Sequence, residues 1–219
     1  MDKIFEKYID KDYKLFQEKL IPNSNILGIR AKNLSLIAKE YIKNNDYSLF
    51  DKELFYHEEK MVYMLMLSHI RDMKLVYDKL DKLIPQIDNW AICDSLNHLK
   101  RIKNNRDLFH KLIDKYKNSK NEFEVRFVLD MYLFHYMDSM YLNEIFNTLK
   151  NIHLDAYYSN IGAAWLLSEC YIRYPKETYV FLKEANLSDF VINKAISKVN
   201  DSFRVDDESK GNLKLLRRK

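Results

Sequence analysis

The 219-residue sequence has little of what several protein classes need. Glycine and proline occur three times each, which disfavours a β-rich fold, because such a fold requires many turn residues. Its two cysteines, Cys93 and Cys170, form neither a CxxC pair nor a zinc-binding spacing. We therefore expect a reduced, cytoplasmic protein that uses no metal ion and no other cofactor.

Long apolar runs are also missing. The longest one, residues 61–70, is interrupted by Ser68 and His69, and a bilayer-spanning helix needs roughly 18 to 20 apolar residues. The N-terminus alternates charged and apolar residues and lacks the apolar core of a secretory signal. We expect no association with a membrane.

Positive charge is present in modest excess and is unevenly distributed. The formal net charge is +4, and two segments, Ser95–Lys120 and Lys194–Lys219, each contain eight Lys or Arg residues. Such segments fit a polyanionic partner. Solvated, lysine-rich helix faces explain the same charges nearly as well.

Helical periodicity dominates the rest of the sequence. Residues 2–20 predict two short amphipathic helices, with Leu15 and Phe16 among the buried residues, and residues 31–42 predict a clear helix. From there, helix starts recur near His57, Asp88, Asn121, Asp155 and Ser188, at intervals of 31, 33, 34 and 33 residues. Each repeat predicts an apolar first helix, a polar break and a second amphipathic helix. This period predicts an all-α fold, an α-solenoid of HEAT-like antiparallel helix pairs, as one domain over residues 1–219.

Both tryptophans fall on first helices of this repeat. Trp90 and Asp94 are four residues apart, so a helix places them on one face. Arg126 lies on the first helix of the next repeat and Trp165 on that of the one after. Each residue alone fits ordinary packing, but together they predict a groove with two aromatic walls, a carboxylate and a cation.

The segments around these residues, 87–94, 122–127 and 163–167, resemble those of the AlkD-type DNA alkylation repair glycosylases, a family of HEAT-like repeats. The resemblance includes Gly28-Ile29-Arg30 before a helix and the closing segment Ser202-Phe203-Arg204. It implies hydrolysis of the N-glycosidic bond of N3- or N7-alkylated purines in double-stranded DNA. It also implies that Asp94 is the catalytic carboxylate.

The resemblance further implies that Trp90 and Trp165 pack against the sugar and backbone at the lesion. It also implies that Arg126 contributes to phosphate binding and to the electrostatics of the site. An alkylated purine is a cation and a good leaving group, so a carboxylate that stabilises the developing sugar cation suits the reaction. The expected contacts to the DNA backbone come from basic residues of the two charged segments: Lys100, Arg101, Lys103, Arg106 and Arg204.

Two alternatives remain open. The chain has Lys32 where many family members have proline, and its region before Trp90 is shorter, which would suit a DNA-binding protein without catalysis. A protein-interaction solenoid is the third possibility, because curved helical stacks commonly bind proteins. In each case we expect a monomer.

Overall fold

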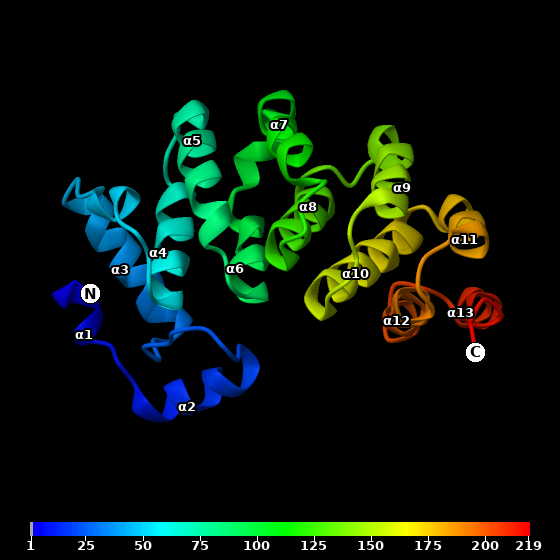
Figure 1. Ribbon diagram of the computed structural model, residues 1–219, viewed down its shortest axis with the longest axis horizontal. Coiled ribbons are helices and arrows are strands. Elements are labelled where there is room, and N and C mark those ends of the chain that lie inside the picture. The colour runs from blue at the N-terminus through cyan, green and yellow to red at the C-terminus, as the bar shows by residue number, and fades with distance from the viewer. Residues whose placement is uncertain (1) are drawn as a thin grey trace. The chain divides into compact units, whose positions relative to one another are not determined.

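A computed structural model describes residues 2–219, which form helices and their connections and contain no β-strand (Figure 1). No helix among these residues is both long enough and apolar enough to cross a bilayer. The α-helices are α1 (Lys3–Glu6), α2 (Lys11–Leu20), α3 (Ala31–Lys43), α4 (His57–Leu67), α5 (Met73–Leu83), α6 (Trp90–Asp94), α7 (Arg106–Tyr116), α8 (Glu122–His135), α9 (Leu142–Asn151), α10 (Tyr157–Arg173), α11 (Pro175–Glu184), α12 (Asp189–Asn200) and α13 (Asp207–Lys214). Short 3₁₀ segments connect several of them: η1 (Ser48–Asp51), η2 (Ile84–Gln86), η3 (Ser95–His98), η4 (Lys100–Asn104) and η5 (Ser139–Tyr141).

The chain divides into two compact units within α7. Unit 1 ends at His110, and unit 2 comprises Lys111–Lys219. In unit 1, α4 contacts α3, α5 and α6, whereas in unit 2 α10 lies between α8 and α12 and also contacts α11. Each unit is thus a stack of helix pairs in which corresponding helices pack side by side, and the predicted α-solenoid fold class is confirmed.

The predicted repeat matches the observed helices closely. The five helices α4, α6, α8, α10 and α12 each begin at the predicted start or within two residues of it. Polar N-caps account for three of these starts, because the side chains of Asn89, Asn121 and Ser188 accept hydrogen bonds from backbone N–H groups of the first turn. The first helix of the Asp88 repeat differs from the prediction, since α6 has only five residues and continues as 3₁₀ turns.

Small residues allow α10 to approach α8 closely. A Cβ atom at Gly162 would lie 3.3 Å from the Leu129 side chain and 3.5 Å from that of Arg126. Ala163, Ala164 and the leucines that follow are fully buried. The lack of a side chain at position 162 therefore sets the spacing on which the unit 2 part of the predicted site depends.

The N-terminal region is anchored through Gly28 and Arg30. Gly28 adopts a positive φ of 88°, and its carbonyl accepts a hydrogen bond of 2.9 Å from the Asp10 backbone N–H. The Arg30 guanidinium pairs with the Asp10 carboxylate (Nη2–Oδ2 2.9 Å) and lies 4.6 Å from the centre of the Tyr13 ring. These contacts fix the start of α2 against the segment that leads into α3, and they explain the Gly-Ile-Arg pattern.

The predicted burial of Leu15 and Phe16 is wrong. Their exposed fractions are 60% and 53%, and α2 has no buried residue. The apolar periodicity of the segment does predict the helix, but no other element of the described chain covers that face of α2.

Replacing Gly28 by Ala is expected to destabilise the protein by about 2 kcal/mol or more. A Cβ atom there would lie 2.5 Å from the Asp10 carbonyl oxygen, and a positive φ disfavours any L side chain. Chemical denaturation measures the free energy of unfolding. Gly211→Ala is the matched control, because Gly211 lies in α13 with open space around it, and alanine there should raise stability slightly. Equal effects of the two substitutions would contradict this role of Gly28.

Candidate active site

The Trp90 and Asp94 pair lies on α6 in unit 1. The two residues are the first and last of this helix, and both side chains are partly exposed. The Trp90 indole N–H donates to the backbone carbonyl of Leu20 at 3.2 Å, which ties the ring to the end of α2. An aromatic face and a carboxylate are therefore accessible from one side of a short, anchored helix.

Arg126 lies on α8 in unit 2 and is only 3% exposed. Its guanidinium donates to the Tyr158 carbonyl on α10 at 3.0 Å, and its Nε lies 3.5 Å from the carboxylate of Asp130 one turn further along α8. Arg126 thus links the two helices from the interior. This placement supports an electrostatic role and gives no support to direct contact with a phosphate.

Of the two predicted site residues in unit 2, Arg126 and Trp165, Trp165 is the more accessible. Its ring packs edge-on against Phe134 of α8 at a centroid distance of 5.7 Å, and the Lys198 ammonium of α12 lies 5.7 Å from the ring centre. A cavity of about 320 Å³ adjoins it, lined mainly by polar side chains of α10 and of the segment from Lys198 to Arg204. Trp165 therefore forms one wall of a polar recess and carries a cation over its ring.

Arg126 and Trp165 lie on the neighbouring helices α8 and α10, but at different heights along the helix axes. Arg126 contacts the start of α10 at Tyr158, whereas Trp165 is seven residues further along that helix, which corresponds to about 10 Å. The Trp90 and Asp94 pair belongs to the other unit. The prediction that all four residues line one groove stays a prediction.

Comparison with protein families identifies the chain. The family described as DNA alkylation repair enzyme matches residues 2–199, which is nearly the whole sequence. The chain belongs to this family. Among curated proteins, none matches the chain. The family assignment confirms the resemblance seen in the sequence and indicates that DNA is what the protein acts on.

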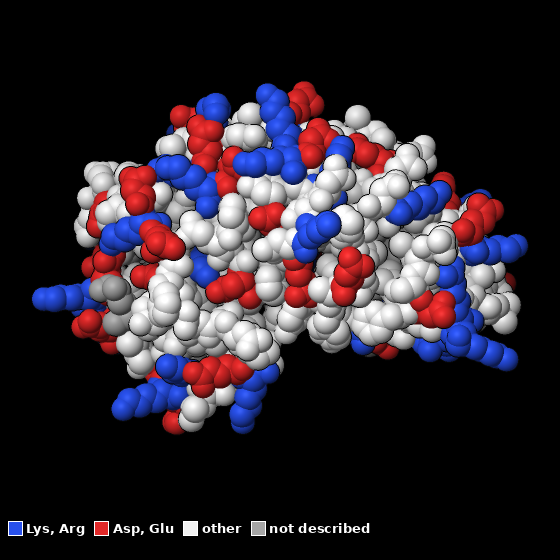
Figure 2. Space-filling model, viewed as in Figure 1, with Lys and Arg blue, Asp and Glu red and all other residues white. Residues whose placement is uncertain are grey.

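The basic residues predicted for the DNA backbone of this family member differ in their surroundings. Lys100 and Lys103 are exposed, and Arg106 is partly buried. In unit 2, the Arg204 guanidinium forms two hydrogen bonds with the Glu169 carboxylate, which raises the pKa of Arg204 further. Figure 2 shows Lys and Arg side chains gathered over α13 and the C-terminal residues, in agreement with the basic C-terminal segment.

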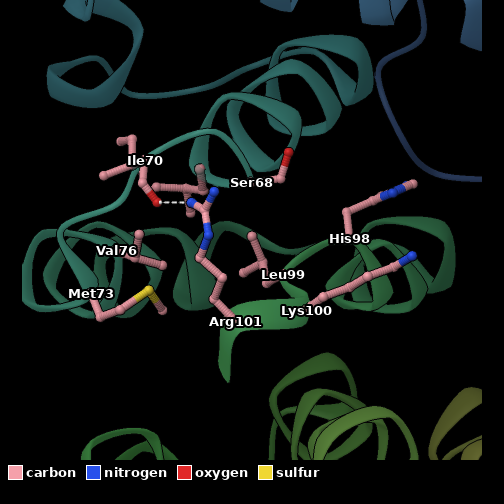
Figure 3. Close-up of a pocket in the computed structure, with 9 residues that line it drawn as sticks. Ser68, Ile70, Met73, Val76, His98, Leu99, Lys100 and Arg101 are labelled. Carbon is pink, nitrogen blue, oxygen red and sulfur yellow. Dashed lines mark hydrogen bonds between the residues drawn. The ribbon is translucent and has the colours of Figure 1, made fainter. Parts of the chain in front are cut away.

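Arg101 is exposed and donates one hydrogen bond within the protein. It borders a cavity of about 210 Å³ in unit 1, where its guanidinium donates to the Ile70 carbonyl at 2.8 Å (Figure 3). Lys100 and His98 extend beside each other, away from Arg101 (Figure 3). Burial lowers the pKa of His98, and the charge of Lys100 lowers it further. At neutral pH the positive charge of the His98 and Lys100 pair therefore comes from Lys100.

Sequence reasoning missed the buried polar residues at the start of α4. Glu58 is fully buried, and its carboxylate accepts hydrogen bonds from the backbone N–H groups of Leu27, Gly28 and Ile29 at 2.9, 2.7 and 3.2 Å. His57, Glu59 and Lys60 are also buried. The only local signal was a run of four charged or polar residues at the start of this helix, directly before its apolar part. Such a run is equally typical of an exposed helix start.

Proposed function

We propose that the protein is a DNA glycosylase that hydrolyses the N-glycosidic bond of N3- or N7-alkylated purines in duplex DNA. The observation that carries the proposal is the Trp90 and Asp94 pair, partly exposed on one face of α6 in a member of the DNA alkylation repair enzyme family. The rest of the proposed site consists of Trp165 and Arg126, with residues 1–219 acting as one monomeric domain.

The reaction suits these side chains. Alkylation at N3 or N7 leaves the purine positively charged, so the base departs without protonation by a general acid. Bond breaking then builds positive charge on the deoxyribose, as in glycoside hydrolysis. The Asp94 carboxylate stabilises this charge and orients the attacking water on the sugar. The faces of Trp90 and Trp165 attract the same cation, by roughly 0.5 to 2 kcal/mol each.

Binding of the duplex is assigned to basic residues that are exposed or partly exposed. Lys100 and Lys103 in unit 1 and Lys198 beside Trp165 in unit 2 offer ammonium groups to phosphates. Arg126 contributes its charge from the interior, where it also holds α8 against α10. Arg204 would have to share its guanidinium between Glu169 and a phosphate.

The proposal is tested by incubating the purified protein with methylated duplex DNA and separating the released bases. We expect release of 7-methylguanine and 3-methyladenine, and no release of uracil or hypoxanthine from matched duplexes, because a neutral base leaves only when an acid protonates it or hydrogen-bond donors stabilise its anion, and the proposed site includes neither. Duplex binding should weaken steeply with salt. Salt-dependent binding without base release would favour a non-catalytic DNA-binding protein. A stoichiometric protein partner and no affinity for DNA would favour an interaction solenoid.

A further inference from the structure

A cluster of buried polar side chains lies at the start of α6 and takes no part in the proposed chemistry. His57 and Lys60 of α4 are 3% and 4% exposed, and Asn89, which precedes α6, is 2% exposed. The Lys60 ammonium pairs with the Asp88 carboxylate at 2.6 Å. Buried polar groups of this kind are maintained only when each is hydrogen-bonded, so their arrangement is sharply defined.

The amide of Asn89 can adopt only one orientation. Its Oδ1 accepts hydrogen bonds from the backbone N–H groups of Ala91 (3.1 Å) and Ile92 (3.3 Å), which only donate. Its Nδ2 lies 2.9 Å from the Asp88 carboxylate, which only accepts, and 3.1 Å from the Ser24 hydroxyl. Rotating the amide by half a turn would place its NH₂ group against the N–H groups of Ala91 and Ile92. It would also place its oxygen against the Asp88 carboxylate.

This orientation favours an unprotonated Nδ1 on His57. The Nδ1 atom of His57 lies 3.2 Å from Nδ2 of Asn89, and an amide nitrogen only donates. A hydrogen bond between the two therefore requires Nδ1 to accept and to carry no proton, with the two N–H bonds of Asn89 shared among Asp88, Ser24 and His57. Burial favours the same state, because it lowers the pKa of His57; Lys60 acts in the same direction, and the carboxylates of Glu58 and Asp88 oppose it.

The cap provided by Asn89 matters more for α6 than for a longer helix. With five residues, α6 has few internal hydrogen bonds, so its first turn depends on the two bonds to Oδ1. Trp90 is the first residue of this turn and Asp94 is the last residue of the helix. A change in the orientation of the Asn89 amide would therefore reach both residues of the proposed site.

We propose that His57 is a positioning residue, whose unprotonated Nδ1 accepts from the Asn89 amide and keeps it in place as the cap of α6, which positions Trp90 and Asp94. A proton on Nδ1 would face the Asn89 NH₂ group, donor against donor. This repulsion would displace the Asn89 side chain from His57 and weaken its hydrogen bonds to the N–H groups of Ala91 and Ile92, and with them the cap. Only the consequence for base release rests on the proposed glycosylase function.

The direction of the pH effect follows from the lowered pKa. The neutral imidazole, and with it the cap, is present at pH values above the ordinary histidine pKa of 6.5. It persists somewhat below that value, because burial disfavours the charged ring. The cap is weakened as the pH falls through the pKa that His57 has in the folded protein, which lies below 6.5.

Tryptophan fluorescence tests the proposal without reference to catalysis. The chain has two tryptophans, so Trp165→Phe leaves Trp90 as the only tryptophan reporter. Between pH 7.5 and 4.5, we expect a one-proton change in Trp90 emission with a midpoint below 6.5. His57→Gln, which offers an amide oxygen that does not titrate, should abolish this step. His69→Gln removes an exposed histidine of the same unit and should leave the step unchanged.

Two further readouts complete the test. Nitrogen-15 NMR of the wild-type protein at pH 7 should show the His57 tautomer with Nδ1 unprotonated, a measurement that does not require any variant to fold. If base release is detected, its rate should fall on the acid side in wild type and not in His57→Gln. The proposal is overturned by a protonated Nδ1 at pH 7, by a fluorescence step that survives His57→Gln, or by the absence of any step. Failure of base release alone would count against the glycosylase and not against this role of His57.

Discussion

Asp94→Asn is expected to slow the release of alkylated purines about a thousandfold, with duplex affinity unchanged within a few-fold. A carboxylate about 4 Å from the developing sugar cation contributes on the order of 4 kcal/mol at an effective dielectric near 20. If this attraction acts only in the transition state, its loss corresponds to about three orders of magnitude in rate. Asparagine has nearly the same shape, so the substitution removes the charge and leaves the packing of α6 intact.

Single-turnover base release from methylated duplex measures this effect, because it isolates the bond-breaking step from product release. Asp107→Asn is the matched control: Asp107 is an exposed aspartate in the first turn of α7, and its loss should not change the rate. Trp90→Phe should retain part of the activity, since an aromatic face remains. Equal rates for wild type and Asp94→Asn would show that Asp94 is not the catalytic carboxylate.

The sequence predicted the helices well because their signals are local. An apolar stripe, a polar cap and a break lie within one or two turns of each other, and the repeat interval then made each start more certain than it would be alone. The proximity of Trp90 and Asp94 follows from the same local geometry. The helix start near Ser188 follows from the same kind of signal, and the structure confirms it, because α12 begins at Asp189.

What the sequence could not predict depends on groups that lie far apart along the chain. The exposure of Leu15 and Phe16 is one case, because periodicity shows that a helix has an apolar face and says nothing about whether another element covers it. The hydrogen bonds of Glu58 are another, since their partners lie about 30 residues earlier.

Arg126 shows how far the prediction of the site extended. Its residue type and helix followed from the sequence, but its burial and its bond to Tyr158 depend on the close approach of α10 at Gly162. The pairing with Asp130 was foreseeable from the four-residue spacing within an apolar run. The helix on which each proposed site residue lies was therefore predictable, while the environment of each residue required the fold.

The substitution with the largest expected effect on stability is Glu58→Ala, which should lower the free energy of unfolding by about 4 kcal/mol. The carboxylate is fully buried and accepts three backbone hydrogen bonds, from Leu27, Gly28 and Ile29. Hydrogen bonds to a charged group contribute roughly 1.5 to 3 kcal/mol each, and truncation would leave three N–H donors buried without partners. Such a loss is a large fraction of the roughly 5 to 15 kcal/mol that stabilises a typical domain.

Denaturant titration at pH 7 measures the loss, with two comparison variants. Glu58→Gln keeps the size of the side chain and one acceptor oxygen, so one side of the contact with residues 27–29 survives and an intermediate loss is expected. Glu53→Ala removes an exposed glutamate a few residues earlier and should change stability by less than about 0.5 kcal/mol. Glu58 holds the backbone around Gly28, and Gly28 in turn positions the start of α2, whose last residue bonds Trp90. A Glu58→Ala protein that stays folded should therefore also show altered Trp90 fluorescence, whereas unchanged stability and emission together would show that the carboxylate is dispensable.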